Sequence, residues 1–154
     1  MIRLKAITKN NFQECIYLDI EEDQKKFVAP NIYSIAGAYI ALTNKDFIPM
    51  LYAIYYEDIM VGFIAMSYEL EDGVYFYDIY RFMIDKRYQS KGYGKEALQK
   101  ALEIIKTYPH GKASVVKVIY TKDNLIAKKL YESIGFKDTG SVNSDGEIIA
   151  QLHL

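Results

Sequence analysis

The spacing of apolar residues changes at Gly92, and no other feature constrains the fold of the chain as much. Over residues 74–80 the side chains alternate as in a β-strand, whereas beyond Gly92 apolar residues recur three and four positions apart, as in an α-helix. A short basic loop joins the two segments, and Gly92 and Gly94 open the helix. The first N–H groups of a helix lack partners within the helix and carry partial positive charge. The loop therefore suits an anion such as phosphate, and glycines that only mark a turn are an equally good interpretation of the loop taken alone.

The rest of the chain shows the same two periodicities in a regular order. We expect a single domain over residues 1–154, because the sequence contains no linker, repeat or low-complexity run. Strands are predicted at 2–8, 50–57, 60–69, 74–84, 113–120, 136–142 and 147–154, and helices at about 11–20, 36–42, 93–109 and 124–134. The order β-α-α-β-β-β-α-β-α-β-β, with antiparallel hairpins in the middle, indicates an α+β (mixed α/β) fold with helices on the faces of a sheet.

The composition is that of an ordinary globular domain. Of 154 residues, 51% are hydrophobic and 25% are charged, and the net charge is −1. This charge gives no argument for nucleic-acid binding, and no apolar segment is long enough to cross a membrane. Cys15 has no second cysteine to pair with, and His110 and His153 lie far apart in the sequence. We therefore expect no disulfide, no metal site and a cytoplasmic protein.

Charge is divided unevenly along the chain. Residues 1–80 contain 12 Asp or Glu against 6 Lys or Arg, whereas residues 81–154 contain 8 against 13. Two interpretations remain open. The charges are segregated by chance on solvated faces, or a basic half holds an anion while an acidic half receives a cation.

Two familiar phosphate loops do not match the segment around Gly92. It lacks the Gly-Lys-Ser/Thr end of a P-loop, and its spacing is not the Gly-x-Gly-x-x-Gly of a dinucleotide-binding fold. Instead Gln89-x-x-Gly92-x-Gly94, placed between a strand and a helix, resembles the pyrophosphate loop of the GNAT superfamily of N-acetyltransferases. Asn124 and residues 127–136 are similar to the next helix of that superfamily, with its Asn…Ala…Leu-Tyr-Glu…Gly-Phe pattern.

Further residues resemble one group within the superfamily, the bacterial spermine/spermidine (diamine) N-acetyltransferases. The matching residues are 21–24, 27–29, Asn31, Ser34, Ala36 and 80–85. The resemblance implies a central, mostly antiparallel sheet flanked by helices. It also implies transfer of acetyl from acetyl-CoA, the one cofactor expected, to a primary amine such as spermidine or spermine. A homodimer is a further expectation from the family.

The resemblance assigns residues to acetyl-CoA. The backbone at the end of the fourth strand would hold the acetyl-pantetheine arm, and the glycine loop would hold the pyrophosphate. The implied residues are Phe82, Met83, Ile84, Gln89, Ser90, Lys91, Gly92, Tyr93, Gly94, Lys95, Asn124 and Lys129. By residue type Asn124 is also a good N-cap, and the two roles are compatible.

Tyr131 matches the family's general acid, which protonates the leaving thiolate. A phenol has an intrinsic pKa of about 10 and stays protonated at neutral pH. Without the resemblance, a core tyrosine in an amphipathic helix explains this residue as well. The base is left open. Tyr80 stands where relatives carry a glutamate, and Asp78, Glu69 and Glu147 are candidates to act through water unless they are solvated surface acids.

An acidic cluster is expected to receive the amine. Glu21, Glu22 and Asp23 follow the first predicted helix, where negative charge is locally unfavourable and a bound polycation would offset it. A solvated charge run is the alternative. The candidate substrate-binding residues are Glu21, Glu22, Asp78 and Tyr80. Two other functions remain open, namely acetylation of a protein N-terminus or an aminoglycoside, and non-catalytic sensing of acetyl-CoA.

Overall fold

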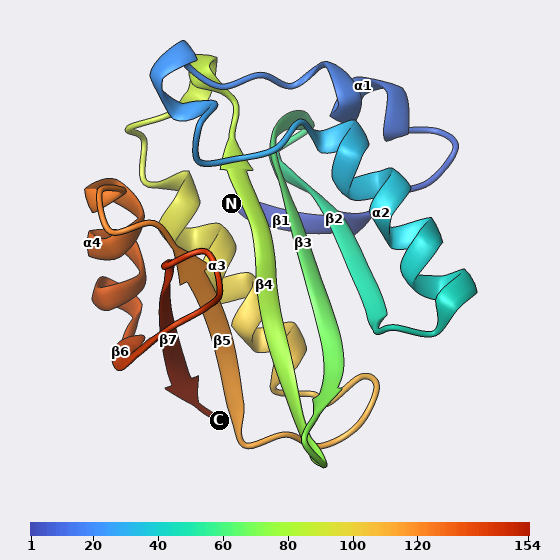
Figure 1. The fold of residues 1–154 in the computed structure, drawn as a ribbon. Coiled ribbons are helices and arrows are strands. Elements are labelled where there is room, and N and C mark those ends of the chain that lie inside the picture. Colours follow the sequence, from blue (N-terminus) through green and yellow to red (C-terminus); the bar gives the residue numbers. More distant parts are fainter.

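In the computed structural model, which describes residues 1–154, seven strands form one sheet in the order β1-β2-β3-β4-β5-β7-β6 (Figure 1). The strands are β1 (Ile2–Ala6), β2 (Ile48–Tyr56), β3 (Ile59–Glu71), β4 (Val74–Ile84), β5 (Val115–Tyr120), β6 (Lys137–Val142) and β7 (Ile148–His153). The helical elements are α1 (Phe12–Tyr17), η1 (Glu22–Gln24), α2 (Asn31–Asn44), η2 (Lys86–Tyr88), α3 (Tyr93–Ile105) and α4 (Leu125–Ile134), η1 and η2 being 3₁₀ turns. Neighbouring strands are antiparallel except β4 and β5. The expected α+β class and the order of strands and α-helices are confirmed.

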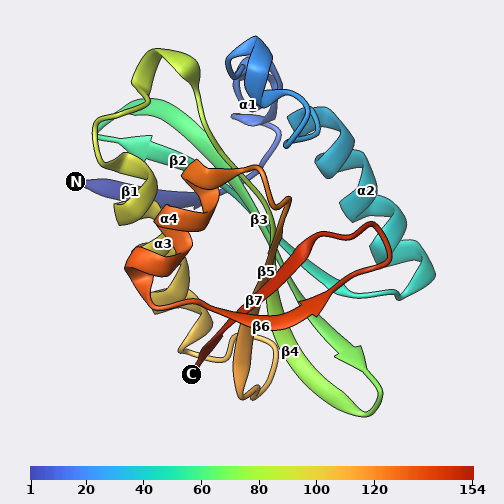
Figure 2. The same ribbon diagram turned by 60° about the vertical axis from the view of Figure 1, so that its left-hand side comes forward.

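Helices cover both faces of the sheet, because the strands direct alternate side chains into two hydrophobic cores (Figures 1 and 2). The larger core lies between the sheet and α3 and α4. In α3 the buried residues recur three and four positions apart: Ala97, Leu98, Ala101, Leu102 and Ile105. The smaller core lies on the side of α1 and α2 and includes Cys15, Phe63 and Met83. None of the helices is long and apolar enough to span a membrane.

The segment between β1 and β2 differs from the two helices that were expected. α1 ends at Tyr17, because the chain becomes extended at Leu18 and buries Leu18 and Ile20 in the smaller core. α2 begins directly after Pro30, whose ring fixes φ near the helical value. The helix therefore starts five residues before the predicted 36–42 segment, and Ser34 lies inside it. The acidic residues 21–23 belong to η1 and its N-cap and do not follow the end of a helix, so the predicted clash of their charge with a helix dipole was wrong.

Candidate active site

The sheet opens between β4 and β5 (Figure 1). Tyr77–Ile79 pair in parallel with Val116–Val118, and beyond this point β4 continues to Ile84 without a partner on its β5 side. The opening lies at the carboxyl ends of two parallel strands. Such a position commonly holds a ligand in mixed sheets.

A β-bulge at Tyr80 marks the start of the opening. Along the β3–β4 ladder, Met66 faces Ile79 and Ala65 faces Arg81, so Tyr80 is the extra residue of β4. A bulge increases the local twist and bends the strand that carries it. We therefore attribute the divergence of β4 from β5 to this bulge.

Backbone groups of β4 point into the opening. The Asp85 N–H donates to the Val61 carbonyl on the β3 side at 2.8 Å. Because an antiparallel strand alternates the direction of its backbone groups, those of Phe82 and Ile84 point away from β3. The Ile84 carbonyl accepts a hydrogen bond from Gln89 Nε2 at 2.9 Å. The Phe82 backbone and the Ile84 N–H are thus directed toward an extended ligand in the gap.

One cavity of about 580 Å³ fills this opening. Its lining comes from β4, the loop before α3, α4, the segment before α2 and the turn between β6 and β7. Sequence-predicted residues in the lining are Asp78, Tyr80, Phe82, Met83, Ile84, Gln89, Ser90, Gly92, Tyr93, Gly94, Lys95, Asn124 and Tyr131. Residues that are far apart in the sequence therefore share a single site.

The loop before α3 has the geometry of an anion site. Ser90 (φ 61°) and Gly92 (φ 83°) adopt left-handed conformations, and Gly92 is the N-cap of α3. Left-handed residues within such a loop turn successive N–H groups toward one side, which forms a concave surface for an anion. Glycine is favoured at position 92 because an L side chain there is strained. Lys95 adds positive charge to the lining, whereas Lys91 is exposed and lies outside it.

α4 places Tyr131 on the opposite side of the opening from β4. Asn124 Oδ1 caps the helix by accepting from the Ala127 N–H at 3.2 Å, and Gly135 (φ 113°) ends it. The Tyr131 ring packs against Tyr120 and Phe136 at centroid distances of 5.8 and 5.7 Å. Burial, with a contribution from the charge of Asp78, raises the pKa of Tyr131 above its ordinary value. The phenol is therefore held in its proton-donating form.

Asp78 lies in β4 just before the bulge, and its Oδ1 is buried without a hydrogen-bond partner. Burial, reinforced by the negative charge of Glu69, raises the pKa of Asp78 to about 7. Glu69 itself accepts a hydrogen bond from the Ser67 hydroxyl. Asp78 faces Ser67 across the β3–β4 ladder, so the three groups lie on one face of the sheet. A carboxyl group in this state can accept a proton near neutral pH.

Tyr80 occupies the bulge with its hydroxyl buried and unbonded. Its ring packs edge-on against Phe47 at 5.6 Å, and burial raises the pKa of the phenol to about 12. The Arg81 guanidinium donates to the Tyr80 carbonyl at 2.8 Å, while its Nε is buried without a partner. The polar atoms of β4 that lack partners therefore cluster around the bulge.

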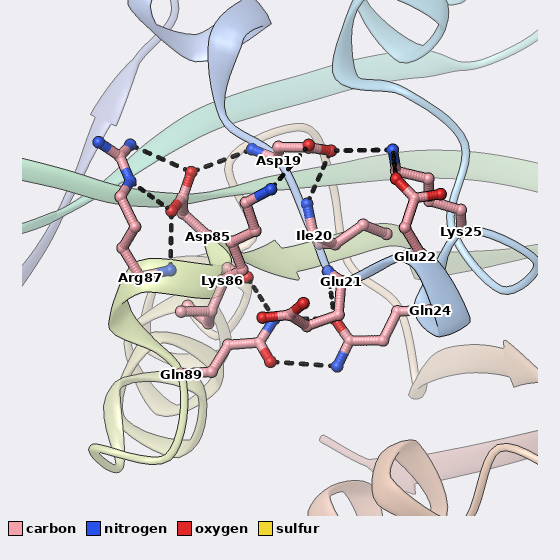
Figure 3. Close-up of polar contacts among 11 residues, drawn as sticks. Asp19, Ile20, Glu21, Glu22, Gln24, Lys25, Asp85, Lys86, Arg87 and Gln89 are labelled. Atoms are coloured by element: carbon pink, nitrogen blue, oxygen red, sulfur yellow. Dashed lines mark hydrogen bonds and ion pairs between the residues drawn. The ribbon is translucent and has the colours of Figure 1, made fainter.

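Two of the predicted acceptor residues do not reach the cavity. Glu21 forms the capping box of η1, and Glu22 pairs with Lys25 at 2.6 Å, so both are engaged in their own turn (Figure 3). Asp23 does line the cavity. Lys129, assigned to CoA by the resemblance, is exposed and also lies outside the lining.

Other lining residues were not singled out from the sequence as site residues. Thr121 lies just after β5, and its hydroxyl is buried without a hydrogen-bond partner. Asn143 also lines the cavity and donates at 3.1 Å across the β6–β7 turn to Oε1 of Glu147, a candidate base from the sequence that lines the cavity as well. Gln24 and Phe27 reach it from the segment before α2. The sequence offered no signal for Thr121 or Asn143, because their position depends on the opening of the sheet.

The family model for the acetyltransferase (GNAT) family matches residues 11–136, so the chain belongs to this family. It is 26% identical to a spermine/spermidine N(1)-acetyltransferase of Bacillus subtilis over 152 residues, which cover 95% of this chain and 94% of the relative. Taken with the fold and the cavity, this defines the chain as an acetyl-CoA-dependent amine N-acetyltransferase.

Solved structures share the fold over nearly the whole chain. The aminoglycoside acetyltransferase AAC(6')-Ib in complex with coenzyme A gives a TM-score of 0.78 at 14% identity, covering 99% of this chain and 95% of that one. The spermidine N-acetyltransferase from Vibrio cholerae, in complex with CoA and spermine, gives 0.71 at 13% identity, covering 99% and 94%. At these identities the likeness establishes the fold alone.

Proposed function

We propose that the enzyme acetylates a primary amine of a polyamine such as spermidine or spermine. The observation that carries this proposal is the charge of the cavity lining. Asp23, Asp78 and Glu147 line the same cavity, and none of them forms an ion pair within the chain. Carboxylates without cationic partners favour a ligand that carries several positive charges. The names of the Bacillus subtilis relative and of the Vibrio cholerae structure agree with this acceptor class.

The residues of the opening suit acetyl-CoA. The N–H groups around Gly92 would hold the pyrophosphate, and the backbone of Phe82 and Ile84 would bind the pantetheine arm by adding hydrogen bonds to the free side of β4. The Thr121 hydroxyl, which has no partner within the chain, adds one more polar group on the opposite wall. The thioester would then lie between Asp78 and Tyr131.

In the proposed mechanism Asp78 is the base and Tyr131 is the acid. Asp78 takes a proton from the substrate ammonium, directly or through one water, which frees the nitrogen lone pair. The nitrogen attacks the thioester carbonyl, so that a C–N bond forms and the C–S bond breaks. The departing sulfur takes the phenolic proton of Tyr131, the second proton of the amine passes through solvent to the resulting phenolate, and Asp78 releases its proton to solvent. The products are an amide and free CoA.

The experiment that tests the proposal is a comparison of acceptors. We expect kcat/KM with acetyl-CoA to be at least about tenfold higher for spermidine or spermine than for an N-terminal peptide or kanamycin, since the peptide offers a single terminal ammonium group and kanamycin holds its several ammonium groups on rigid, bulky rings. Preferred turnover of the peptide or of kanamycin would overturn the polyamine assignment. Binding of acetyl-CoA without turnover of any amine would make the protein a sensor instead.

We also propose that the enzyme is cytoplasmic and forms a homodimer. Cys15 is buried and unpaired, and burial raises the pKa of its thiol to about 12, so it stays a thiol. No disulfide demands an oxidising environment, which agrees with the proposed cytoplasmic location. The homodimer stays a prediction, which light scattering of the purified protein would test.

A further inference from the structure

The segment of residues 19–28, here called the strap, crosses from the end of α1 toward α2 and lies against the loop before α3 (Figure 3). Its members Ile20, Asp23, Gln24, Phe27 and Val28 line the same cavity as the anion-binding loop. The strap therefore carries Asp23, one of the carboxylates proposed to bind the amine, and it contacts the loop proposed to hold CoA.

The first anchor of the strap is Asp85, at the end of β4. The Asp19 N–H donates to Asp85 Oδ2 at 3.0 Å, and the Lys86 N–H donates to the Asp19 carbonyl at 2.8 Å. Asp85 is only 2% exposed, and Arg87 donates to its Oδ1 at 2.8 Å. Burial alone would raise the pKa of Asp85, but these hydrogen bonds lower it. This anchor holds the start of the strap to β4 and does not reach the anion-binding loop.

The second anchor is a pair of side-chain amides. Gln24 Nε2 donates to Gln89 Oε1 at 3.1 Å, and Gln89 Nε2 donates to Gln24 Oε1 at 2.9 Å (Figure 3). Gln89 Nε2 also donates to the Ile84 carbonyl, and Gln24 Oε1 also accepts from the Glu21 N–H at 3.2 Å. Gln89 Nε2 thus uses both of its hydrogens, and Gln24 Oε1 uses both of its lone pairs. This arrangement fixes which way each amide points.

Gln89 begins the anion-binding loop, so this pair joins the strap to the residues that would hold the pyrophosphate. The strap also reaches the other wall of the opening, where Lys26 lies 3.9 Å from Asp123, just before α4. The contact between Lys26 and Asp123 is exposed and weak. The Gln24–Gln89 pair is therefore the better defined link between the strap and the walls of the opening.

We propose that Gln24 is a positioning residue, which holds Gln89 in place and makes the binding of CoA and of the amine mutually reinforcing. This inference rests on the proposed function. When CoA fixes the loop, the amide pair fixes the strap, and the strap supplies part of the acceptor lining. Coupling between two ligands is reciprocal, so an amine that orders the strap must tighten CoA binding by the same factor.

The test is calorimetry with CoA, which binds without reacting, in the absence and presence of saturating spermidine. For the wild-type protein we expect spermidine to lower the Kd of CoA at least about fivefold. In Gln24→Ala we expect the Kd of CoA alone to rise about 3- to 30-fold, since both hydrogen bonds to Gln89 are lost, and the effect of spermidine to fall below about twofold. A residue that only supports the fold would lower Tm and leave the spermidine effect unchanged.

A double-mutant cycle tests the coupling between Gln24 and Gln89 without the amine. We expect that Gln24→Ala introduced into Gln89→Ala changes the Kd of CoA less than about twofold, because the partner is already absent. The matched control is Gln13→Ala, an exposed glutamine of α1 outside the cavity lining, which should behave as the wild type. Equal effects of Gln24→Ala with and without Gln89, or a wild-type Kd that spermidine does not change, would overturn the inference.

The two proposals fail differently. If CoA does not bind the wild-type protein, or no polyamine is acetylated, the proposed function is wrong. If CoA binds and spermidine is acetylated but Gln24→Ala keeps the wild-type Kd and spermidine effect, the function stands and the role of Gln24 is wrong.

Discussion

Asp78 on β4 and Tyr131 on α4 line one cavity from its two walls, and the charge of Asp78 contributes to the raised pKa of Tyr131. The pKa of the Asp78 carboxyl is raised to about 7, and the pKa of the Tyr131 phenol is raised above its ordinary value of 10. Between these two values one group is ready to accept a proton and the other to donate one. Pairs of groups with separated pKa values are the usual basis of acid–base catalysis at neutral pH.

Asp78→Asn should remove the proposed base. Because the pKa of Asp78 is about 7, kcat/KM for spermidine should rise as pH increases through about 7 in the wild type. In the variant we expect kcat/KM at pH 8 to fall by about 10²–10⁴-fold and this rising limb to disappear. Steady-state kinetics between pH 5.5 and 9 measures both. A variant that keeps the wild-type profile would show that another group takes the proton.

The same substitution should stabilise the fold at high pH. A carboxyl whose folded-state pKa lies above its ordinary value contributes stability fully below about pH 4, and this contribution is lost as pH rises to about 7. Asp78→Asn should therefore unfold with a free energy higher by up to about 4 kcal/mol at pH 8 and with little difference at pH 4. Urea unfolding at the two pH values measures this, with the exposed Asp46→Asn as control. Equal stability of Asp78→Asn and wild type at pH 8 would contradict the burial of an unpaired charge.

Tyr131→Phe tests the proposed general acid. The ring stays in its packing against Tyr120 and Phe136, and only the hydroxyl is lost. We expect kcat to fall by about 10- to 1,000-fold while the Kd of acetyl-CoA changes less than about twofold. The control is Tyr75→Phe, a tyrosine of β4 outside the cavity lining. An unchanged kcat would remove Tyr131 from the mechanism.

Features set by neighbouring residues could be predicted from the sequence, and features set by strand register could not. The glycine loop at Gly92 and the helix from Asn124 to Gly135 rest on caps and periodicity, which are local signals. The bulge at Tyr80 depends on which β3 residue pairs with which β4 residue. The contact between Gln24 and Gln89 joins residues 65 positions apart, and no local pattern encodes it. The state of Asp78 likewise follows from its neighbours across the sheet, not from its place in the chain.

Gly92→Asp tests the anion-binding loop. The aspartate would bring negative charge to the start of α3, where the pyrophosphate is proposed to bind, so the Kd of acetyl-CoA should rise at least about tenfold. Gly73→Asp is a matched control, because Gly73 has a similar φ of 79° in the β3–β4 turn, away from the cavity lining. Both variants carry comparable backbone strain, so calorimetry separates the loss of binding from the loss of stability. A folded Gly92→Asp protein with wild-type affinity would refute the assignment of the loop.

Glu147→Gln tests whether the β6–β7 turn recognises a second ammonium group. Glu147 Oε1 accepts from the Asn143 side chain, and a glutamine oxygen can accept the same hydrogen bond without the charge. We expect the KM for spermidine to rise about 3- to 10-fold, as for a partly buried charge pair, and the KM for butylamine to change less than twofold. Asp145→Asn, in the same turn but exposed and outside the lining, should change neither. An equal rise in KM for spermidine and butylamine would mean that Glu147 shapes the cavity and does not select polycations.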